Sequence, residues 1–260
     1  MSDNRDLVKQ QFGAHAQNYV TSAVHAAGES LDRMLELVQP QPAWRALDIA
    51  TGGGHTALAF APRVREVTVT DITPEMLVAA ERFIRGKGYS NVAFHEADAS
   101  ALPFADDEFD LVTCRMAPHH FPDCAGFVRE MARVLRPGGL AAMIDNTAPG
   151  EAVAARHINA LEKLRDPSHN WLYSPGEWEA FFTAAGFTVE HLEIFKKPLD
   201  FEQYCNRMNA PAHTRLQLRA MLRHAPASAL ESLAPVFTDD PLHGPVKFYL
   251  DEVLIIGRRE

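Results

Sequence analysis

The sequence predicts a doubly wound α/β fold with a mostly parallel sheet. Short apolar runs alternate with amphipathic helical patterns along most of the chain, a rhythm typical of βαβ units. The runs at 109–115 and 139–145 are apolar almost throughout, as in strands that are buried on both faces. With 260 residues and a hydrophobic share of 47%, the chain is long enough to bury one substantial core. We therefore expect residues 1–260 to form a single domain.

Five strands are expected before residue 150. They lie at 45–50, 66–72, 91–98, 109–115 and 139–145. Helical patterns at 76–88 and 125–139 separate some of these strands, and both patterns close on glycines. Two later strands, at 186–199 and 246–259, show stronger polar alternation, which is typical of strands nearer the edge of a sheet.

Three helical regions lie outside this alternation, and we expect them to cover the carboxyl ends of the strands. An N-terminal helical lid is expected over 1–40, and two helical cap insertions over 149–178 and 200–243. They surround a cofactor-binding core at 41–148. Ligands of open α/β sheets bind at the carboxyl ends of the strands, so the lid and the cap should enclose the site.

Composition narrows the classes of partner. The net charge of −9 and the pI near 5.7 argue against a nucleic acid partner that is bound through its backbone. No apolar run reaches the roughly 18 residues of a membrane helix, and the polar start does not resemble a signal peptide. Three scattered cysteines suggest reduced thiols. We expect a cytoplasmic protein with no membrane partner, and a homodimer is left open.

The stretch "ALDIATGGGHTAL" (46–58) predicts a ligand-binding loop after the first strand. Its Gly52, Gly54 and Ala57 satisfy the dinucleotide pattern G-x-G-x-x-[GA], so the glycines alone do not identify the ligand. Asp48 distinguishes a dinucleotide from a ligand without phosphate, because a carboxylate would repel a pyrophosphate at the helix N-terminus. S-adenosylmethionine has no phosphate and carries an ammonium and a sulfonium, which an acid favours. The alternative is a plain tight turn with a surface Asp48.

Acids also end the next two strands. Asp71 stands seventeen positions after Gly54, where a carboxylate can accept both hydroxyls of a ribose. The alternative for Asp71 is a turn or N-cap carboxylate for the helix that opens at "TPEM". Asp98, in "EADASALPF", can accept from the amino group of an adenine while the Ala99 amide donates to the ring. A turn carboxylate is the alternative for Asp98.

Four motifs in order resemble the class I S-adenosylmethionine-dependent methyltransferases. They are "LDIATGGGHTAL", "VTDITPEML", "EADASALPFADDEFDLVTCRMAPHHF" and "REMARVLRPGG". The chain is most similar in style to the small-molecule group that includes the ubiquinone/menaquinone-biosynthesis C-methyltransferases. The resemblance implies a Rossmann-like seven-stranded sheet whose C-terminal strand inserts antiparallel. It departs at Ala50, where the family has the first glycine of the loop, and this narrows the backbone angles available there.

The resemblance also implies a set of cofactor contacts beyond the three acids. The N-terminal "QQFGAHAQNYVTS" resembles the family's first helix, where Tyr19 would fold over the cofactor. S-adenosyl-L-methionine is the expected cofactor and S-adenosyl-L-homocysteine its product. The remaining expected contacts are Ala50, Thr51, Gly52, Gly54, Ile72, Met76, Ala99 and Arg115.

Methyl transfer is an in-line displacement, so the protein must align the acceptor, exclude water and, where needed, remove a proton. The segment "CRMAPHHFPD" follows the fourth strand and offers His119 and His120 as bases, since an imidazole titrates near neutral pH. One alternative is that the pair packs against Phe121 while Asp123 caps a helix. Another is a metal site completed by Asp123 and Cys124, but the spacing does not support it and no metal is expected.

The segment at 165–178 supplies candidate substrate contacts, His169 and Trp171, for an anionic or flat acceptor. The alternative is an ordinary turn followed by a helix that Ser174 caps. We expect a methyltransferase that acts on C, O or N of a small molecule. Two other functions stay open: an adenosylmethionine-binding protein without turnover, and a nicotinamide-dependent oxidoreductase.

Overall fold

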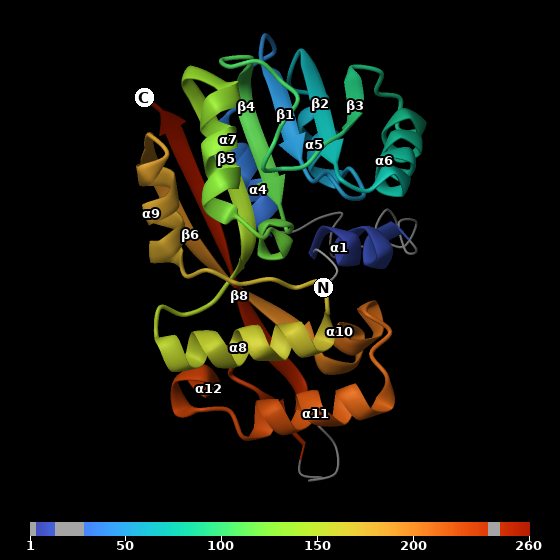
Figure 1. Ribbon diagram of the computed structural model, residues 1–260, viewed down its shortest axis with the longest axis vertical. Coiled ribbons are helices and arrows are strands. Elements are labelled where there is room, and N and C mark those ends of the chain that lie inside the picture. The colour runs from blue at the N-terminus through green and yellow to red at the C-terminus, as the bar shows by residue number, and fades with distance from the viewer. Residues whose placement is uncertain (1–3, 14–28, 239–244) are drawn as a thin grey trace.

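The computed structural model describes residues 4–13, 29–238 and 245–260, and in this part of the chain eight strands form one mixed sheet (Figure 1). Their order is β3-β2-β1-β4-β5-β8-β6, and the short β7 pairs with β8. The bounds are β1 Arg45–Ile49, β2 Glu66–Asp71, β3 Val92–Glu96, β4 Phe109–Arg115, β5 Leu135–Thr147, β6 Phe187–Asp200, β7 Val236–Phe237 and β8 Pro245–Arg259.

The strand directions confirm the predicted fold class. Strands β1 to β5 pair in parallel, whereas β8 runs antiparallel to both β5 and β6. The C-terminal strand therefore inserts antiparallel inside the sheet, as the resemblance implies. Seven of the eight strands are the expected ones, and the additional β7 is only two residues long.

Helices cover both faces of this sheet (Figure 1). One apolar cluster includes Phe127 and Trp178, from the side of α7 and α9. A second cluster includes Met34, Phe60 and Ile84, from α4, α5 and α6. Burying a side chain of this size stabilises the fold by roughly 1.5–3 kcal/mol. The helices on the two faces are α4 Glu29–Val38, α5 His55–Phe60, α6 Pro74–Gly86, α7 Cys124–Val134 and α9 Pro175–Ala184.

A second helical layer lies beyond the carboxyl ends of the parallel strands (Figure 1). It has an apolar core of its own, to which Ile158, Tyr204, Leu218 and Phe248 contribute. The extended ends of β6 and β8 run down into this layer, and helix α1 lies between it and the sheet. Its helices are α8 Ala152–Arg165, α10 Phe201–Arg207, α11 Ala212–Arg223 and α12 Ala227–Leu233, and α1 is Asn4–Gly13.

Two expected boundaries were wrong. The helix expected over 125–139 ends at Val134, because the backbone turns extended at Leu135 to pair with Phe109 of β4. The third strand ends at Glu96 rather than at residue 98. Of the two later strands, β6 is the edge strand and β8 lies next to it, between β5 and β6, so both are near an edge as expected. No helix within the described residues is long and apolar enough to cross a membrane.

Candidate active site

Three adjoining cavities lie where the carboxyl ends of the strands meet α1 and the second helical layer. The loop cavity borders the glycine loop and the ends of β2 and β4. The third-strand cavity borders the segment after β3, and the cap cavity lies against α8, β6 and α10. The loop cavity and the cap cavity share three lining residues, Phe12, Met116 and His120. The two cavities therefore meet at these three side chains.

The loop between β1 and α5 requires left-handed backbone at three positions. Ala50 and Gly52 both have a φ of 53°, and Gly54 has a φ of 83°. Ala50 and Gly52 line the loop cavity, whereas Gly54 packs on α6. A Cβ at Gly54 would lie 3.0 Å from Ile84 Cδ1 and 3.1 Å from Ala80 Cβ. The departure at Ala50 thus places an alanine in a conformation that favours glycine.

Asp48 lies beneath this loop and is only 2% exposed. Its carboxylate accepts hydrogen bonds from the hydroxyls of Thr51 and Thr113, both at 2.7 Å. Burial raises the pKa of Asp48 to about 6, although these two hydrogen bonds favour the ionised form. Asp48 lines none of the three described cavities. It supports the loop from below and can act on a ligand only through its charge.

Asp71 at the end of β2 lines the loop cavity and fixes the loop. One carboxylate oxygen accepts from the Gly52 N–H at 2.9 Å, and the other accepts from the Thr73 N–H at 2.9 Å. Burial raises the pKa of this carboxyl. Each oxygen keeps a further lone pair, so the contacts of a turn carboxylate and those of a ribose acceptor are compatible. Both expected roles of Asp71 can therefore be filled at once.

The other expected contacts gather in the same place. Arg115 lines the loop cavity and donates to Thr56 Oγ1 at 3.1 Å. Burial lowers the pKa of Arg115, although nearby acids oppose this effect. Thr51, Ile72 and Met76 line the loop cavity as well. Tyr19 lies outside the described residues.

Asp98 and Ala99 line the third-strand cavity. One Asp98 oxygen accepts from the Ser100 N–H at 2.9 Å, as a turn carboxylate does. The other forms an ion pair with Arg5 of α1, with 2.6 Å between Nε and Oδ2. Ile72 also lines this cavity, so it is apolar on the side next to the loop cavity. The carboxylate of Asp98 thus ties α1 to the edge of the site.

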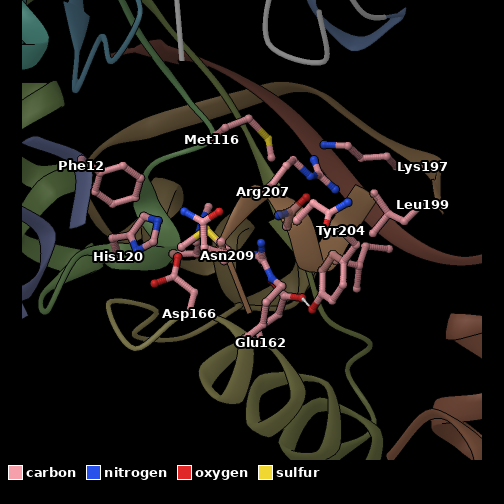
Figure 2. A pocket seen from close by; sticks show the side chains of 16 residues that line it. Phe12, Met116, His120, Glu162, Asp166, Lys197, Leu199, Tyr204, Arg207 and Asn209 are labelled. Atoms are coloured by element: carbon pink, nitrogen blue, oxygen red, sulfur yellow. Dashed lines mark hydrogen bonds and ion pairs between the residues drawn. The ribbon is translucent and has the colours of Figure 1, made fainter. Parts of the chain in front are cut away.

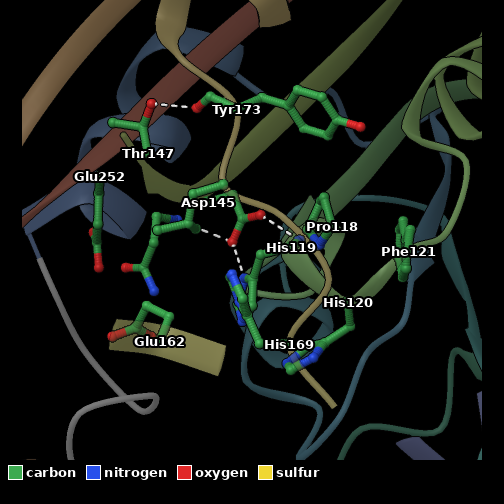
Figure 3. Close-up of polar contacts among 12 residues, drawn as sticks. Pro118, His119, His120, Phe121, Asp145, Thr147, Glu162, His169, Tyr173 and Glu252 are labelled. Atoms are coloured by element: carbon green, nitrogen blue, oxygen red, sulfur yellow. Dashed lines mark hydrogen bonds and ion pairs between the residues drawn. The ribbon is translucent and has the colours of Figure 1, made fainter. Parts of the chain in front are cut away.

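His119 is held by an acid at the end of β5 (Figure 3). Its ring Nδ1 lies 2.6 Å from Asp145 Oδ1, and its backbone N–H donates to Asp145 Oδ2 at 2.7 Å. Burial opposes protonation of the ring, but the Asp145 carboxylate outweighs it and raises the pKa of His119. Because Nδ1 faces the Asp145 carboxylate, Nε2 is the ring nitrogen that remains for a ligand. His119 lines the cap cavity.

His120 lines all three cavities. Because Pro118–His120 form a 3-10 turn rather than an extended segment, His119 and His120 both reach the cap cavity. The ring Nδ1 of His120 lies 3.1 Å from the Ser168 carbonyl, and its ring meets Phe12 edge to face at 5.0 Å. Burial, and after it the charge of His119, lowers the pKa of His120 to about 3. His120 is therefore a neutral wall residue.

The two expected substrate contacts, His169 and Trp171, lie outside the three cavities. His169 is 1% exposed, and its Nε2 lies 2.9 Å from Asn159 Oδ1. Burial lowers the pKa of His169 to about 4. Trp171 donates its backbone N–H to the His119 carbonyl at 3.1 Å. Neither His169 nor Trp171 lines any of the three described cavities.

The cap cavity contains a buried charged group (Figure 2). Arg165 donates to Glu162 at 2.9 Å, and the Tyr204 hydroxyl donates to the other Glu162 oxygen. Burial favours the neutral acid, yet the charge of Arg165 lowers the pKa of Glu162 to about 2. The guanidinium of Arg165 also lies 4.4 Å from the centre of the Tyr204 ring. The two charges balance each other inside the cavity wall.

Sequence reasoning missed Asp145, Met116 and Phe12. Asp145 carried a usable signal, because it stands at the end of a predicted strand as Asp48 and Asp71 do. Met116 carried none, although its φ of 58° places it in strained left-handed backbone on the wall between two cavities.

Some of the structural alternatives given for these residues are confirmed. Asp123 caps α7 by accepting from Gly126 N–H, and Ser174 caps α9 in a capping box with Glu177. The Cys124 thiol donates to the Pro118 carbonyl at 3.3 Å. Among the described residues, no group of three or more His, Cys, Asp and Glu side chains is arranged to hold a metal ion.

Comparison with known proteins gives consistent results. A family model described as a methyltransferase domain matches residues 47–143. The uncharacterized methyltransferase YcgJ of Bacillus subtilis is 37% identical over 246 residues, which cover 95% of this chain and 96% of the relative. The demethylmenaquinone methyltransferase of Chlorobaculum parvum is 35% identical over 174 residues, which cover 61% of this chain and 70% of the relative.

Solved structures extend the similarity beyond residues 47–143. The crystal structure of YcgJ has a TM-score of 0.85 and covers 89% of this chain and 98% of its own. A structure of a methyltransferase from Bacillus halodurans, described there as putative, is 35% identical with a TM-score of 0.85, covering 89% and 99%. Both similarities take in far more than the 47–143 match.

Proposed function

The chain belongs to the class I S-adenosylmethionine-dependent methyltransferases, and from that premise we propose that it methylates a small molecule at an acidic hydroxyl. The adenosylmethionine would occupy the loop cavity and the third-strand cavity, and the acceptor the cap cavity. The observation that carries the proposal is the shared wall of Phe12, Met116 and His120. Because the two cavities meet at these residues, ligands in both would lie next to each other at this junction.

The residues of the loop cavity fit the cofactor. Gly52 brings a backbone without a Cβ to the cavity, and Asp71 offers free lone pairs beside it for ribose hydroxyls. Arg115 offers a cation to the carboxylate of the methionine part, and ionised Asp48 a negative charge to its ammonium. Ile72 and Ala99 supply apolar contact for the adenine. These donors and acceptors support adenosylmethionine rather than a dinucleotide, since a buried acid under the loop opposes a pyrophosphate.

When bound, adenosylmethionine supplies a methyl group on a positively charged sulfur that leaves readily. The protein then has to hold the acceptor in line, exclude water and accept a proton. His119 can do the last, because Asp145 fixes Nδ1 as the protonated nitrogen and leaves Nε2 as the acceptor. The raised pKa makes His119 a stronger base than an unpaired histidine. His120 closes the cavities against water and stays neutral.

A methyl-transfer assay with labelled adenosylmethionine and a cell extract, followed by a panel of phenols and quinone-type compounds, tests this proposal. We expect labelled product from wild type and at least a hundredfold less from His119→Asn, the scale of general base catalysis. Adenosylhomocysteine should raise the melting temperature of both proteins equally, because His119 does not line the loop cavity. Full activity of His119→Asn would overturn the role of His119. Failure of adenosylhomocysteine to stabilise wild type would overturn the cofactor assignment.

A further inference from the structure

Asn146 is a buried polar side chain that lines the cap cavity without a partner. It follows Asp145 at the end of β5 and is 7% exposed. Its backbone N–H donates to Asp145, but its side chain forms no hydrogen bond to any residue of the described chain. Leaving a buried amide unpaired costs roughly 1–3 kcal/mol. An amide in that position is stabilised when a ligand in the cavity supplies the missing bond.

Other charged groups of this cavity already have partners. Glu162 is bonded to Arg165 and to Tyr204. Lys197 donates to Glu252 at 2.5 Å. The ligand is therefore not needed to neutralise these groups, and besides Asp166, Arg207 and Asn209 it meets apolar side chains. Those apolar side chains are Met116, Leu199, Met208 and Leu250.

We propose that Asn146 binds a second hydroxyl of the acceptor, next to the hydroxyl that His119 deprotonates. This inference rests on the proposed function. His119 is fixed by Asp145, the neighbour of Asn146 in β5, and both side chains line the same cavity. A hydroxyl both donates and accepts, so it satisfies the Asn146 amide in either orientation of that amide. The proposal places the two polar groups of the acceptor on neighbouring atoms, where both residues can reach them from the carboxyl end of β5.

Because an imidazole is a weak base, it limits the kind of molecule that can carry these hydroxyls. An imidazole can take a proton from a phenol, whose pKa is near that of tyrosine, about 10, far more readily than from an alkyl alcohol. A flat ring also suits the apolar part of the wall. The acceptor class is thus an aromatic ring with two adjacent hydroxyls. The reacting oxygen gives its proton to His119 Nε2 and forms the new bond to the methyl carbon, while the bond from that carbon to sulfur breaks and its electron pair stays on sulfur.

Catechol and phenol, used as probes with wild type and Asn146→Ala, test the inference. We expect wild type to have at least a tenfold higher kcat/KM for catechol than for phenol, the equivalent of one hydrogen bond at about 1.4 kcal/mol. In Asn146→Ala this ratio should approach one. Catechol should also bind more weakly to the adenosylhomocysteine-saturated variant in calorimetry. Asn206→Ala is the matched control, because Asn206 lines the cavity but accepts from Arg215.

The outcomes separate the two proposals. A ratio that is the same in wild type and Asn146→Ala overturns the role of Asn146. Equal use of phenol and catechol by wild type, or no turnover of catechol, overturns the acceptor class. Neither result touches the proposed function, which stands or falls with adenosylhomocysteine binding and the His119 variant. Loss of selectivity in Asn206→Ala as well would show a general loosening of the cavity and overturn the specific role.

Discussion

The carboxylate of Asp145 accepts from His119 twice, at 2.7 Å from the backbone N–H and at 2.6 Å from ring Nδ1. The first contact fixes the position of the 3-10 turn, and the second fixes which ring nitrogen carries the proton. Because Asp145 is 1% exposed, solvent does not screen this pair. A single acid at the end of β5 therefore determines both where the base is and how strong it is.

Replacing Asp145 by Asn should lower the pKa of His119. In wild type the titration midpoint of His119, followed by NMR, is expected above 6.5, and in Asp145→Asn it should be lower, because the largest effect that opposes burial is removed while the charges of Glu162 and Asp166 remain. The stabilising pair of charges is fully present below the unfolded pKa and is lost as the pH rises through the raised folded pKa. His157, whose Nε2 bonds a carbonyl far from Asp145, is the internal reference. An unchanged His119 midpoint would contradict the role of Asp145.

The order of strands and the acids that end them could be predicted from sequence, since both follow from local patterns. Apolar runs and glycines located β1 to β5, and the antiparallel insertion of β8 followed from the resemblance. The helix boundary at Val134 could not be predicted, because the extended turn at Leu135 is set by pairing with Phe109 across the sheet. Local helix signals extend past the point at which tertiary pairing ends the helix.

The residues of the site could likewise be predicted only in part. Asp71 and Arg115 line the loop cavity because the ends of neighbouring parallel strands meet there. The cap cavity brings His119 together with Glu162 and Tyr204, which are distant in sequence and come from helices of the second layer. No local pattern gives that pairing. His169 has the residue type of a ligand contact, but its partner Asn159 lies inside the cap.

Replacing Asp71 by Ala should weaken both the ligand and the loop. We expect adenosylhomocysteine to bind about 2–3 kcal/mol more weakly, the scale of hydrogen bonds to a charged group, in calorimetry. The melting temperature should fall as well, because Gly52 and Thr73 lose their acceptor. Asp110→Ala is the matched control, since this 7%-exposed acid accepts from the Arg45 N–H at the opposite end of the sheet. It should lower stability without changing affinity, and equal affinity loss in both variants would contradict a direct contact at Asp71.

The affinity for adenosylhomocysteine should depend on pH through Asp48. With a pKa of about 6, Asp48 is mostly ionised at pH 7 and mostly neutral at pH 5. Only the ionised form attracts the ammonium group of the ligand, so binding releases a proton, and affinity should fall by up to about tenfold per pH unit below 6. Calorimetry of wild type and Asp48→Asn at pH 5 and pH 7 checks this. The variant should bind more weakly at pH 7 and lose the dependence, whereas identical pH profiles would refute the linkage.

Replacing Ala50 by Gly should stabilise the protein. Left-handed backbone at an alanine costs about 1–2 kcal/mol, and the glycine loses more entropy on folding, so a net gain of about 0.5–1 kcal/mol is expected. Urea unfolding measures it. Ala155→Gly in α8 is the control, since a right-handed helical position should lose about 1 kcal/mol. A loss at Ala50 as large as that at Ala155 would show that the methyl contact outweighs the backbone strain.

Helix α1 should open and close over the cofactor. None of its residues is buried, and its attachments to the rest of the site are mainly polar. Asn4 donates to the His120 carbonyl at 2.7 Å, and Arg5 pairs with Asp98 at 2.6 Å. Its Phe12 packs against Met76 and Ala79 of α6 and meets the ring of His120. Because none of its residues is fully buried, docking of α1 removes little apolar surface from water, and a ligand beneath α1 would add contacts that favour the docked state.

Hydrogen exchange of residues 4–13 with and without adenosylhomocysteine decides this. We expect fast exchange that slows at least tenfold on binding, because closure buries the amides and excludes water from the site. Arg5→Ala should exchange faster in both states and bind adenosylhomocysteine less tightly. Lys9→Ala is the control, since its ion pair with Glu96, at 3.4 Å, is exposed on both sides and contributes little. Equal protection of α1 in the free and bound protein would mean that the helix is permanently docked, and the lid would then have no role in excluding water.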